Sequence, residues 1–139
     1  MEMIDYFKLA FEKYADFKTR SNKSEYWWFV LAYLILGLIL GALLFIGLSL
    51  ESTPIIYLMG GLMALIGLAL FIPSLAIAVR RLHDTGKSGW WYLISLIPYI
   101  GGIVLIFFLA SKSQAGANKW GPEIGSSGND LKDSLVNFD

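Results

Sequence analysis

The sequence predicts an all-α membrane protein with three transmembrane helices and an N-terminal amphipathic helix at the membrane interface. Of its 139 residues, 56% are hydrophobic and only 16% are charged, whereas about 25% of residues are charged in an average soluble domain. The apolar residues form three long runs, and they do not follow the two-residue or 3.6-residue period of a soluble core. Together these observations predict one small membrane domain.

The first segment, residues 1–20, is predicted to form the amphipathic helix. Apolar side chains recur at helical spacing and charged side chains fill the other positions: Ile4, Phe7, Phe11 and Tyr14 against Glu2, Asp5, Lys8, Glu12 and Asp16. The segment is too charged to span a bilayer, and it lacks the apolar region and cleavage site of a signal peptide. It lies along the membrane interface or packs on the protein itself, and the sequence leaves both interpretations open.

Residues 21–122 are predicted to form the membrane domain, with spans at about 26–50, 55–79 and 90–110. At a rise of 1.5 Å per residue, the first run is about 37 Å long, which exceeds the ~30 Å hydrocarbon core of a bilayer. The remaining residues, 123–139, contain too few apolar side chains to build a core. They are predicted to form a flexible C-terminal tail.

Prolines and glycines are expected to modify the spans. Pro73 removes a backbone donor and should kink the second span. In the third span, Pro98 followed by two glycines, the first of them Gly101, marks a bend or a close helix contact. In the first span, Gly37 and Gly41 form a G-x-x-x-G pattern, which is typical either of packing within the chain or of contact with a second copy.

Basic residues near the span ends predict the orientation in the membrane. The N-terminal segment carries five of them and a polar hinge at residues 80–91 carries three, whereas the loop around Glu51 carries none. The positive-inside rule therefore predicts that the N-terminus and the hinge are cytoplasmic. Three spans would place the chain after the third span outside, but that part carries three lysines, so its side stays undecided.

The hinge concentrates the side chains that suit contact with a ligand or partner. Basic and aromatic residues at the hinge and at the entry to the first span suit anionic headgroups: Arg80, Arg81, His83, Asp84, Lys87, Trp90 and Trp91, with Arg20 and Trp27. Membrane lipids with anionic headgroups on the cytoplasmic leaflet are therefore the first expected partner. A second copy of the chain or another membrane protein is the second.

Ion pairs and glycines are expected to shape the hinge. Glu25, at the start of the first span, is expected to pair with one of the two hinge arginines at the end of the second span. Asp84 follows these arginines at helical spacing, so it should also pair with one of them. Gly86 and Gly89 are then expected to end the helix in a turn.

Composition excludes several classes of protein. The chain has no cysteine and one histidine, which excludes disulfides, thiolate sites and a conventional zinc centre, so no metal or cofactor is expected. Eleven basic residues balance eleven acidic ones, and a net charge of zero gives no basis for nucleic-acid binding.

The leading hypothesis is a non-enzymatic, membrane-embedded interaction or anionic-lipid-contacting module. A small oligomeric transport or pore component is the alternative, although spans without ionisable residues do not suit a monomeric proton-coupled pump. A membrane enzyme acting on a phosphate-bearing lipid is the third hypothesis, because His83 beside Asp84 suits a general base.

Three motifs in the sequence also resemble those of a known family. They comprise residues 17–20, Lys23 and residues 25–27; residues 75–84 with Gly86, Ser88, Gly89 and Trp90; and residues 97–101 with Gly116, Asn118 and Gly121. With these motifs the chain resembles the YhaH/YhaI type of small bacterial inner-membrane protein, known as domain of unknown function 805. The resemblance implies a bacterial source and an inner-membrane location, and it implies no activity because the family has none assigned.

Overall fold

The computed structural model describes residues 3–123, and its regular elements within that range are helical. In chain order they are α1 (Met3–Glu12), α2 (Lys23–Ser49), α3 (Thr53–Asp84), the 3-10 helix η1 (Gly89–Leu96) and α4 (Gly101–Ala110). The predicted tail at 123–139 lies outside the described residues, apart from Glu123.

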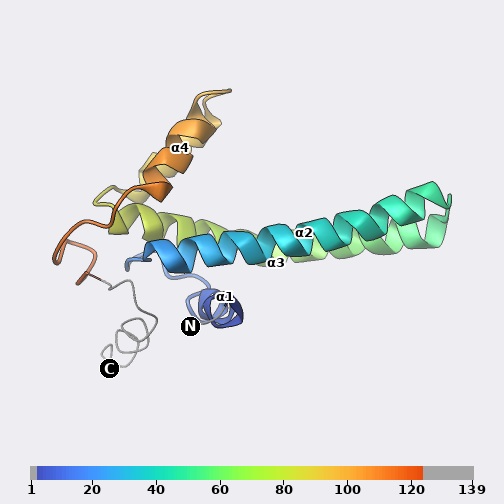
Figure 1. Cartoon of the computed structure of the whole chain (residues 1–139), viewed down its shortest axis with the longest axis horizontal. Helices are drawn as coiled ribbons and strands as arrows, with labels where there is room; N and C mark the ends of the chain where they lie inside the picture. The colour runs from blue at the N-terminus through green and yellow to red at the C-terminus, as the bar shows by residue number, and fades with distance from the viewer. Residues whose placement is uncertain (1–2, 124–139) are drawn as a thin grey trace.

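Two long helices, α2 and α3, form the body of the molecule and lie side by side along its longest axis (Figure 1). Asn22 begins α2, because its side-chain oxygen accepts a hydrogen bond from the Glu25 N–H at 2.8 Å. Glu51, with a φ of 52°, makes the turn into α3. Near this turn the helices approach closely at Gly47, where an added Cβ would lie 2.6 Å from Cγ2 of Ile55. Helices α2 and α3 therefore pack closely against each other at the Glu51 end.

Both long helices leave most of their apolar surface uncovered. With 27 and 32 residues, α2 and α3 are each long enough and apolar enough to cross a membrane. In the most apolar 18-residue stretch, only 11% of the α2 residues and 28% of the α3 residues are buried. A core helix of a soluble protein would be covered by its neighbours, so this exposed apolar surface is more typical of helices that contact lipid.

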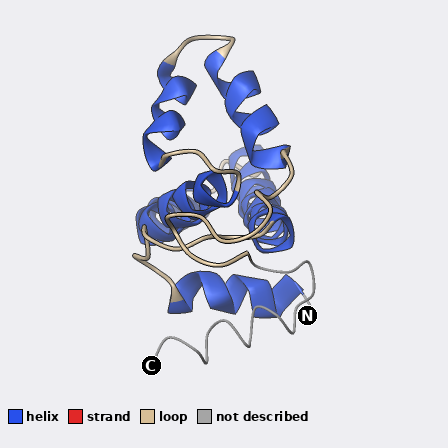
Figure 2. Ribbon diagram, turned by 90° about the vertical axis from the view of Figure 1, so that its left-hand side faces the viewer, coloured by secondary structure: helices blue, strands red, loops and turns tan. Residues whose placement is uncertain are grey.

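The third predicted span, 90–110, is not one continuous helix, so a third transmembrane helix is not confirmed. The run is divided into η1 and α4, which pack against each other as a hairpin with its tip at residues 97–100 (Figure 2). Pro98 and the positive φ of Tyr99, 67°, reverse the chain at the tip. The ten residues of α4 extend only about 15 Å, which is half of a ~30 Å hydrocarbon core.

Helix α1 crosses the long pair instead of running along it. Figure 1 shows α1 almost end-on, and Figure 2 shows it on the opposite side of the pair from the η1–α4 hairpin. Tyr6, Leu9 and Ala10 are buried against the protein, whereas Ile4 and Phe11 are exposed. The helix is shorter than the predicted segment 1–20, because the chain leaves helical geometry after Glu12.

The buried residues concentrate at the end of the pair opposite Glu51. One apolar cluster contains Ala10, Phe29 and Ile77, and a second contains Leu82, Leu105 and Leu109. These clusters join α1, α2, α3 and α4 around the end of α3. This end of the molecule also carries the charged residues that the sequence singles out.

Candidate functional site

Three segments that are far apart in the sequence meet at the end of α3. They are the linker at 13–22, the hinge at 80–91 and the segment at 111–121 that follows α4 (Figure 1). The linker joins the hinge through a hydrogen bond of 3.0 Å from Ser21 N–H to the Arg80 carbonyl. The C-terminal segment joins it through one of 2.7 Å from Gln114 N–H to the Asp84 carbonyl.

Asp84 lies at the centre of the junction and is bonded by three side chains. One carboxylate oxygen accepts from Arg20 Nε at 2.9 Å, and the other accepts from Arg81 Nη1 at 2.5 Å and from the Ser113 hydroxyl. All three charged side chains are at most 1% exposed. Because an isolated buried charge is very unfavourable, these groups depend on one another.

Arg20 and Arg81 also bond the backbone of the C-terminal segment. Arg20 donates to the carbonyls of Gly116 and Gln114, both at 2.7 Å. Arg81 donates to the Leu109 carbonyl at 2.9 Å and to the Ser111 carbonyl. A guanidinium group has several N–H donors in one plane. The side chains of Arg20 and Arg81 can therefore hold the segment after α4 against the hinge.

The ion pair expected for Glu25 is present, and its partner is Arg80 at 2.5 Å, with both side chains fully buried. Within the described part of the chain, Arg80 Nε and Nη2 and Glu25 Oε2 are buried without a hydrogen-bond partner. Lys13 is buried nearby in the linker, where burial lowers its pKa and the charge of Glu25 acts in the opposite direction. This pair is therefore less completely bonded than the group around Asp84.

Burial of the arginines corrects the prediction that they face lipid phosphates. Arg20, Arg80 and Arg81 are at most 1% exposed, because their charges are bonded to carboxylates and carbonyls inside the protein. Trp27 is half-buried and packs beside the cluster that contains Leu82.

Three predicted contact residues, Lys87, Trp90 and Trp91, lie on the hairpin side and stay accessible, whereas His83 and Asp84 are buried. Trp90 is 79% exposed and Trp91 is 49% exposed. Lys87 is half-buried, with its ammonium 4.8 Å from the centre of the Phe108 ring. The predicted contact set is thus divided between buried arginines and an accessible aromatic surface.

His83 is held by the linker and the C-terminal segment. Its Nδ1 lies 3.0 Å from the Thr19 carbonyl, and its ring is nearly parallel to that of Trp120, with centroids 4.4 Å apart. A carbonyl oxygen only accepts hydrogen bonds, so Nδ1 carries the hydrogen. The Asp84 carboxylate accepts from arginines and a serine instead of from His83, so the geometry does not support the His–Asp general base of the third hypothesis.

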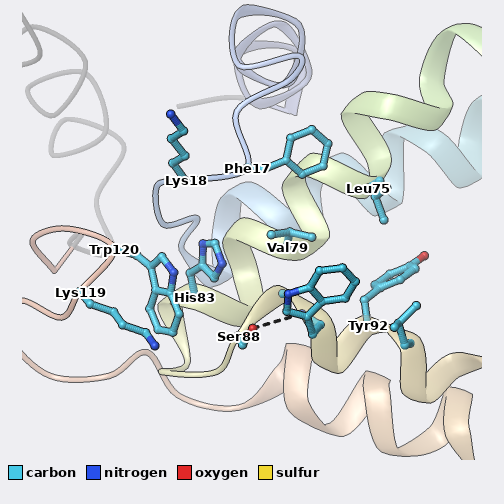
Figure 3. Close-up of a pocket in the computed structure, with 12 residues that line it drawn as sticks. Phe17, Lys18, Leu75, Val79, His83, Ser88, Tyr92, Lys119 and Trp120 are labelled. Carbon is cyan, nitrogen blue, oxygen red and sulfur yellow. Dashed lines mark hydrogen bonds between the residues drawn. The ribbon is translucent and has the colours of Figure 1, made fainter.

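A cavity of about 690 Å³ opens beside His83, between the linker, α3, η1 and the C-terminal segment (Figure 3). Its lining combines apolar and aromatic side chains with cations: Phe17, Lys18, Leu75, Val79, His83, Ser88, Gly89, Trp90, Tyr92, Leu93, Lys119 and Trp120. The side chains of Lys18 and Lys119 are exposed at its rim.

The predicted glycines have different roles in the structure. Gly86 follows the end of α3 with a φ of 82°, so it provides the expected turn. Gly89 allows a close approach, since an added Cβ would lie 2.6 Å from Cγ1 of Val79. An added Cβ at Gly37 or Gly41 would meet no atom within 4 Å, so the G-x-x-x-G face makes no close contact within the described chain.

Sequence reasoning missed the role of residues 111–121. Asn118 donates to the His83 carbonyl at 2.9 Å and accepts from the Trp120 N–H at 2.9 Å, which positions Trp120 over the histidine. Gly116 and Gly121 have φ values of 71° and 131°. The signal was present in the closing motif, whose Gly116, Asn118 and Gly121 lie in the loop that reaches the hinge.

Comparison with known proteins identifies the family. The family described as "Protein of unknown function (DUF805)" matches residues 14–122, which include the three segments that meet at the end of α3 except for Lys13. The chain belongs to the DUF805 family. No solved structure matches the chain.

Among curated proteins, this DUF805 chain is similar to two from Escherichia coli strain K12. It is 36% identical to "Inner membrane protein YhaI" over 126 residues, which cover 88% of this chain and 99% of the relative. It is 34% identical to "Inner membrane protein YhaH" over 121 residues, which cover 86% of this chain and 96% of the relative. These relatives support an inner-membrane location for the DUF805 protein.

Proposed function

We propose that this DUF805 protein is a non-enzymatic, membrane-embedded module that contacts anionic lipid headgroups at the cytoplasmic face of the inner membrane. The observation that carries this proposal is the cavity beside His83, which joins exposed lysines to an apolar wall. Lys18 and Lys119 at its rim belong to the linker and the segment after α4, which lie at the end of the long helix pair away from the α2–α3 turn (Figure 1). Clusters of basic side chains at a membrane surface favour anionic lipids.

The lysines and tryptophans take over the contact role first expected of the arginines. The three buried arginines hold the linker, hinge and C-terminal segment together, so lipid phosphates meet other side chains. Trp90 and Trp91 are exposed next to the cavity, and tryptophan favours the headgroup layer of a bilayer.

The proposed topology has two spans and one half-inserted hairpin. Helices α2 and α3 cross the bilayer, and the η1–α4 hairpin enters only the cytoplasmic leaflet. Support comes from the junction, because residues 111–116 bond Arg20, Arg81 and Asp84 at the same end as the linker. The N-terminus, the hinge and the segment after α4 are then all cytoplasmic, in agreement with their lysines. Helix α1, which crosses the long pair, lies along the interface.

The hairpin tip suits an apolar environment. Tyr99, Ile100 and Ile103 are 95%, 66% and 71% exposed. The N–H groups of Ile97, Ile100 and Gly101 all donate to carbonyls within the hairpin, and Pro98 has no N–H. Backbone donors that are bonded internally lower the cost of leaving water.

A homo-oligomer is the second candidate, and the open glycine face favours it. Gly37 and Gly41 lie on α2 with nothing within 4 Å of an added Cβ. Small residues let helices from two chains approach closely in lipid. A homo-oligomer of this kind could form a transport or pore component. The test is leak of a solute from vesicles that contain the protein, which should change when Gly41 is replaced by a bulky residue.

The proposed function predicts selective stabilisation by anionic lipid. Adding phosphatidylglycerol to the purified full chain in mild detergent should raise its melting temperature by several degrees, since a ligand of the folded state stabilises it by mass action. Phosphatidylcholine is the control and should have a smaller effect. The difference should shrink at about 0.5 M salt, where exposed charges are screened. Equal stabilisation by both lipids at low salt would contradict the proposal.

A further inference from the structure

We propose that the cavity beside His83 is a specific site for one anionic glycerophospholipid, which places its phosphate at the lysine rim and an acyl chain along the apolar wall. This inference rests on the proposed function and assigns it to particular residues. The volume of about 690 Å³ lies in the range of about 300–1,000 Å³ that is usual for small-molecule sites.

The polar part of the cavity offers a phosphate group a cation on either side of the His83 and Trp120 rings. Figure 3 shows the His83 and Trp120 rings side by side, with the Lys18 and Lys119 side chains on opposite sides of them. The Lys119 ammonium lies 4.5 Å from the centre of the Trp120 ring, so the ring orients this cation at the rim. Since Nδ1 of His83 donates to the Thr19 carbonyl, the other nitrogen of the neutral ring is an acceptor, which suits a hydroxyl of the lipid headgroup and not the phosphate.

The apolar part continues from the rim toward the hairpin. Leu75 and Val79 of α3 form one wall, while Trp90 and Leu93 of η1 form the other. Leu93 is 52% exposed, on the helix that we place in the cytoplasmic leaflet. An acyl chain that follows this wall therefore reaches the bilayer interior. A soluble phosphate compound has no acyl chain and cannot make these contacts.

The walls are fixed by the buried network and do not depend on a ligand. Asn118 bonds both the His83 carbonyl and the Trp120 N–H, so the two stacked rings are positioned by one side chain. Gly89 packs directly on Val79, which holds η1 against α3. A preformed cavity costs less conformational entropy on binding than one that must be ordered by its ligand.

The test is lipid titration of the full chain followed by native mass spectrometry. The variant Lys18→Gln with Lys119→Gln removes both rim cations, whereas Lys23→Gln with Lys112→Gln removes two exposed lysines that do not line this cavity. Both variants lose the same charge. We expect phosphatidylglycerol binding to weaken about tenfold or more in the cavity variant and less than about twofold in the control.

A third variant tests the apolar wall. Leu93→Trp adds volume beside the cavity at a half-exposed position, so it should reduce lipid binding without changing the melting temperature in lipid-free detergent. Equal losses in the cavity and control lysine variants would overturn the site, while leaving the preference for anionic lipid intact. Absence of that preference in the unaltered chain would instead overturn the proposed function.

Soluble phosphate compounds distinguish a lipid from a free ligand. Glycerol 3-phosphate and inorganic phosphate, each at millimolar concentration, should not displace bound phosphatidylglycerol, because they lack the acyl chain. Displacement at equal concentration by either compound would show that the cavity is a site for a soluble phosphate and would contradict the lipid assignment.

Discussion

Replacing Asp84 with asparagine is expected to lower the free energy of unfolding by about 3–5 kcal/mol, the range found when one partner of a buried ion pair is removed. The Asp84 carboxylate is the shared partner of Arg20 and Arg81, and all three side chains are at most 1% exposed. Asparagine keeps the shape but removes the charge, so two buried guanidinium groups lose their counter-ion. The melting temperature of the purified variant in mild detergent should fall by about 10 °C.

Glu12→Gln is the matched control for this prediction. Glu12 is exposed at the end of α1, so the same loss of charge should change stability by less than about 0.5 kcal/mol. If the two variants melted at the same temperature, the buried charge cluster would not be what holds the three segments together.

Replacing Gly101 with alanine should disrupt the hairpin, whereas Gly102→Ala should not. A Cβ at Gly101 would lie 1.7 Å from the Ile94 carbonyl oxygen, and the obstacle is backbone that cannot rotate away. A Cβ at Gly102 would meet nothing within 4 Å. Alanine favours a helix over glycine by up to about 1 kcal/mol, so the Gly102 variant should be neutral or more stable.

Thermal unfolding of the two alanine variants in detergent measures the difference. The Gly101 variant is expected to melt several degrees below the unaltered chain, because η1 must separate from α4. The Gly101 variant should also loosen the junction at the end of α3, since Leu105 and Leu109 of α4 pack on Leu82 at the hinge. Identical melting of the two variants would mean that the chain does not turn back at residues 97–100.

Local features of the fold could be predicted from the sequence. The two long helices follow from uninterrupted apolar runs, and the helix end at Gly86 follows from the turn preference of glycine. The partner of Glu25 was predictable as one of two arginines, because the loop at Glu51 makes the helices antiparallel and brings their far ends together. These predictions depended on residues within one helix or one helical pair.

The hairpin was not predictable from hydropathy. A run of about twenty apolar residues has the same composition whether it crosses the bilayer or turns back within it. Pro98 and Gly101 marked a bend correctly, but the angle of the bend depends on contact between Gly101 and the Ile94 carbonyl. That contact is part of the tertiary structure, so a local sequence pattern does not predict it.

The burial of the arginines was missed for a related reason. Arg20 and Arg81 are bonded largely by carbonyls of residues 109–116, and every residue has a carbonyl whatever its side chain. A sequence pattern therefore gives no sign of these partners. When these carbonyl partners are not known, arginines next to a membrane span are interpreted as lipid contacts, because that is the commoner role of arginine at this position.

In the topology that we propose, residues 111–121 return to the same membrane face as the linker and the hinge. The chain contains no cysteine, so single cysteines can be placed at Ser52, Lys87 and Lys112 and labelled with a membrane-impermeant maleimide. We expect Ser52→Cys to react in cells with a permeabilised outer membrane, and Lys87→Cys and Lys112→Cys to react only after the inner membrane is opened. If Lys112→Cys reacted together with Ser52→Cys before the inner membrane is opened, residues 111–121 would lie on the opposite face from the hinge. That result would contradict the proposed topology and support a third span.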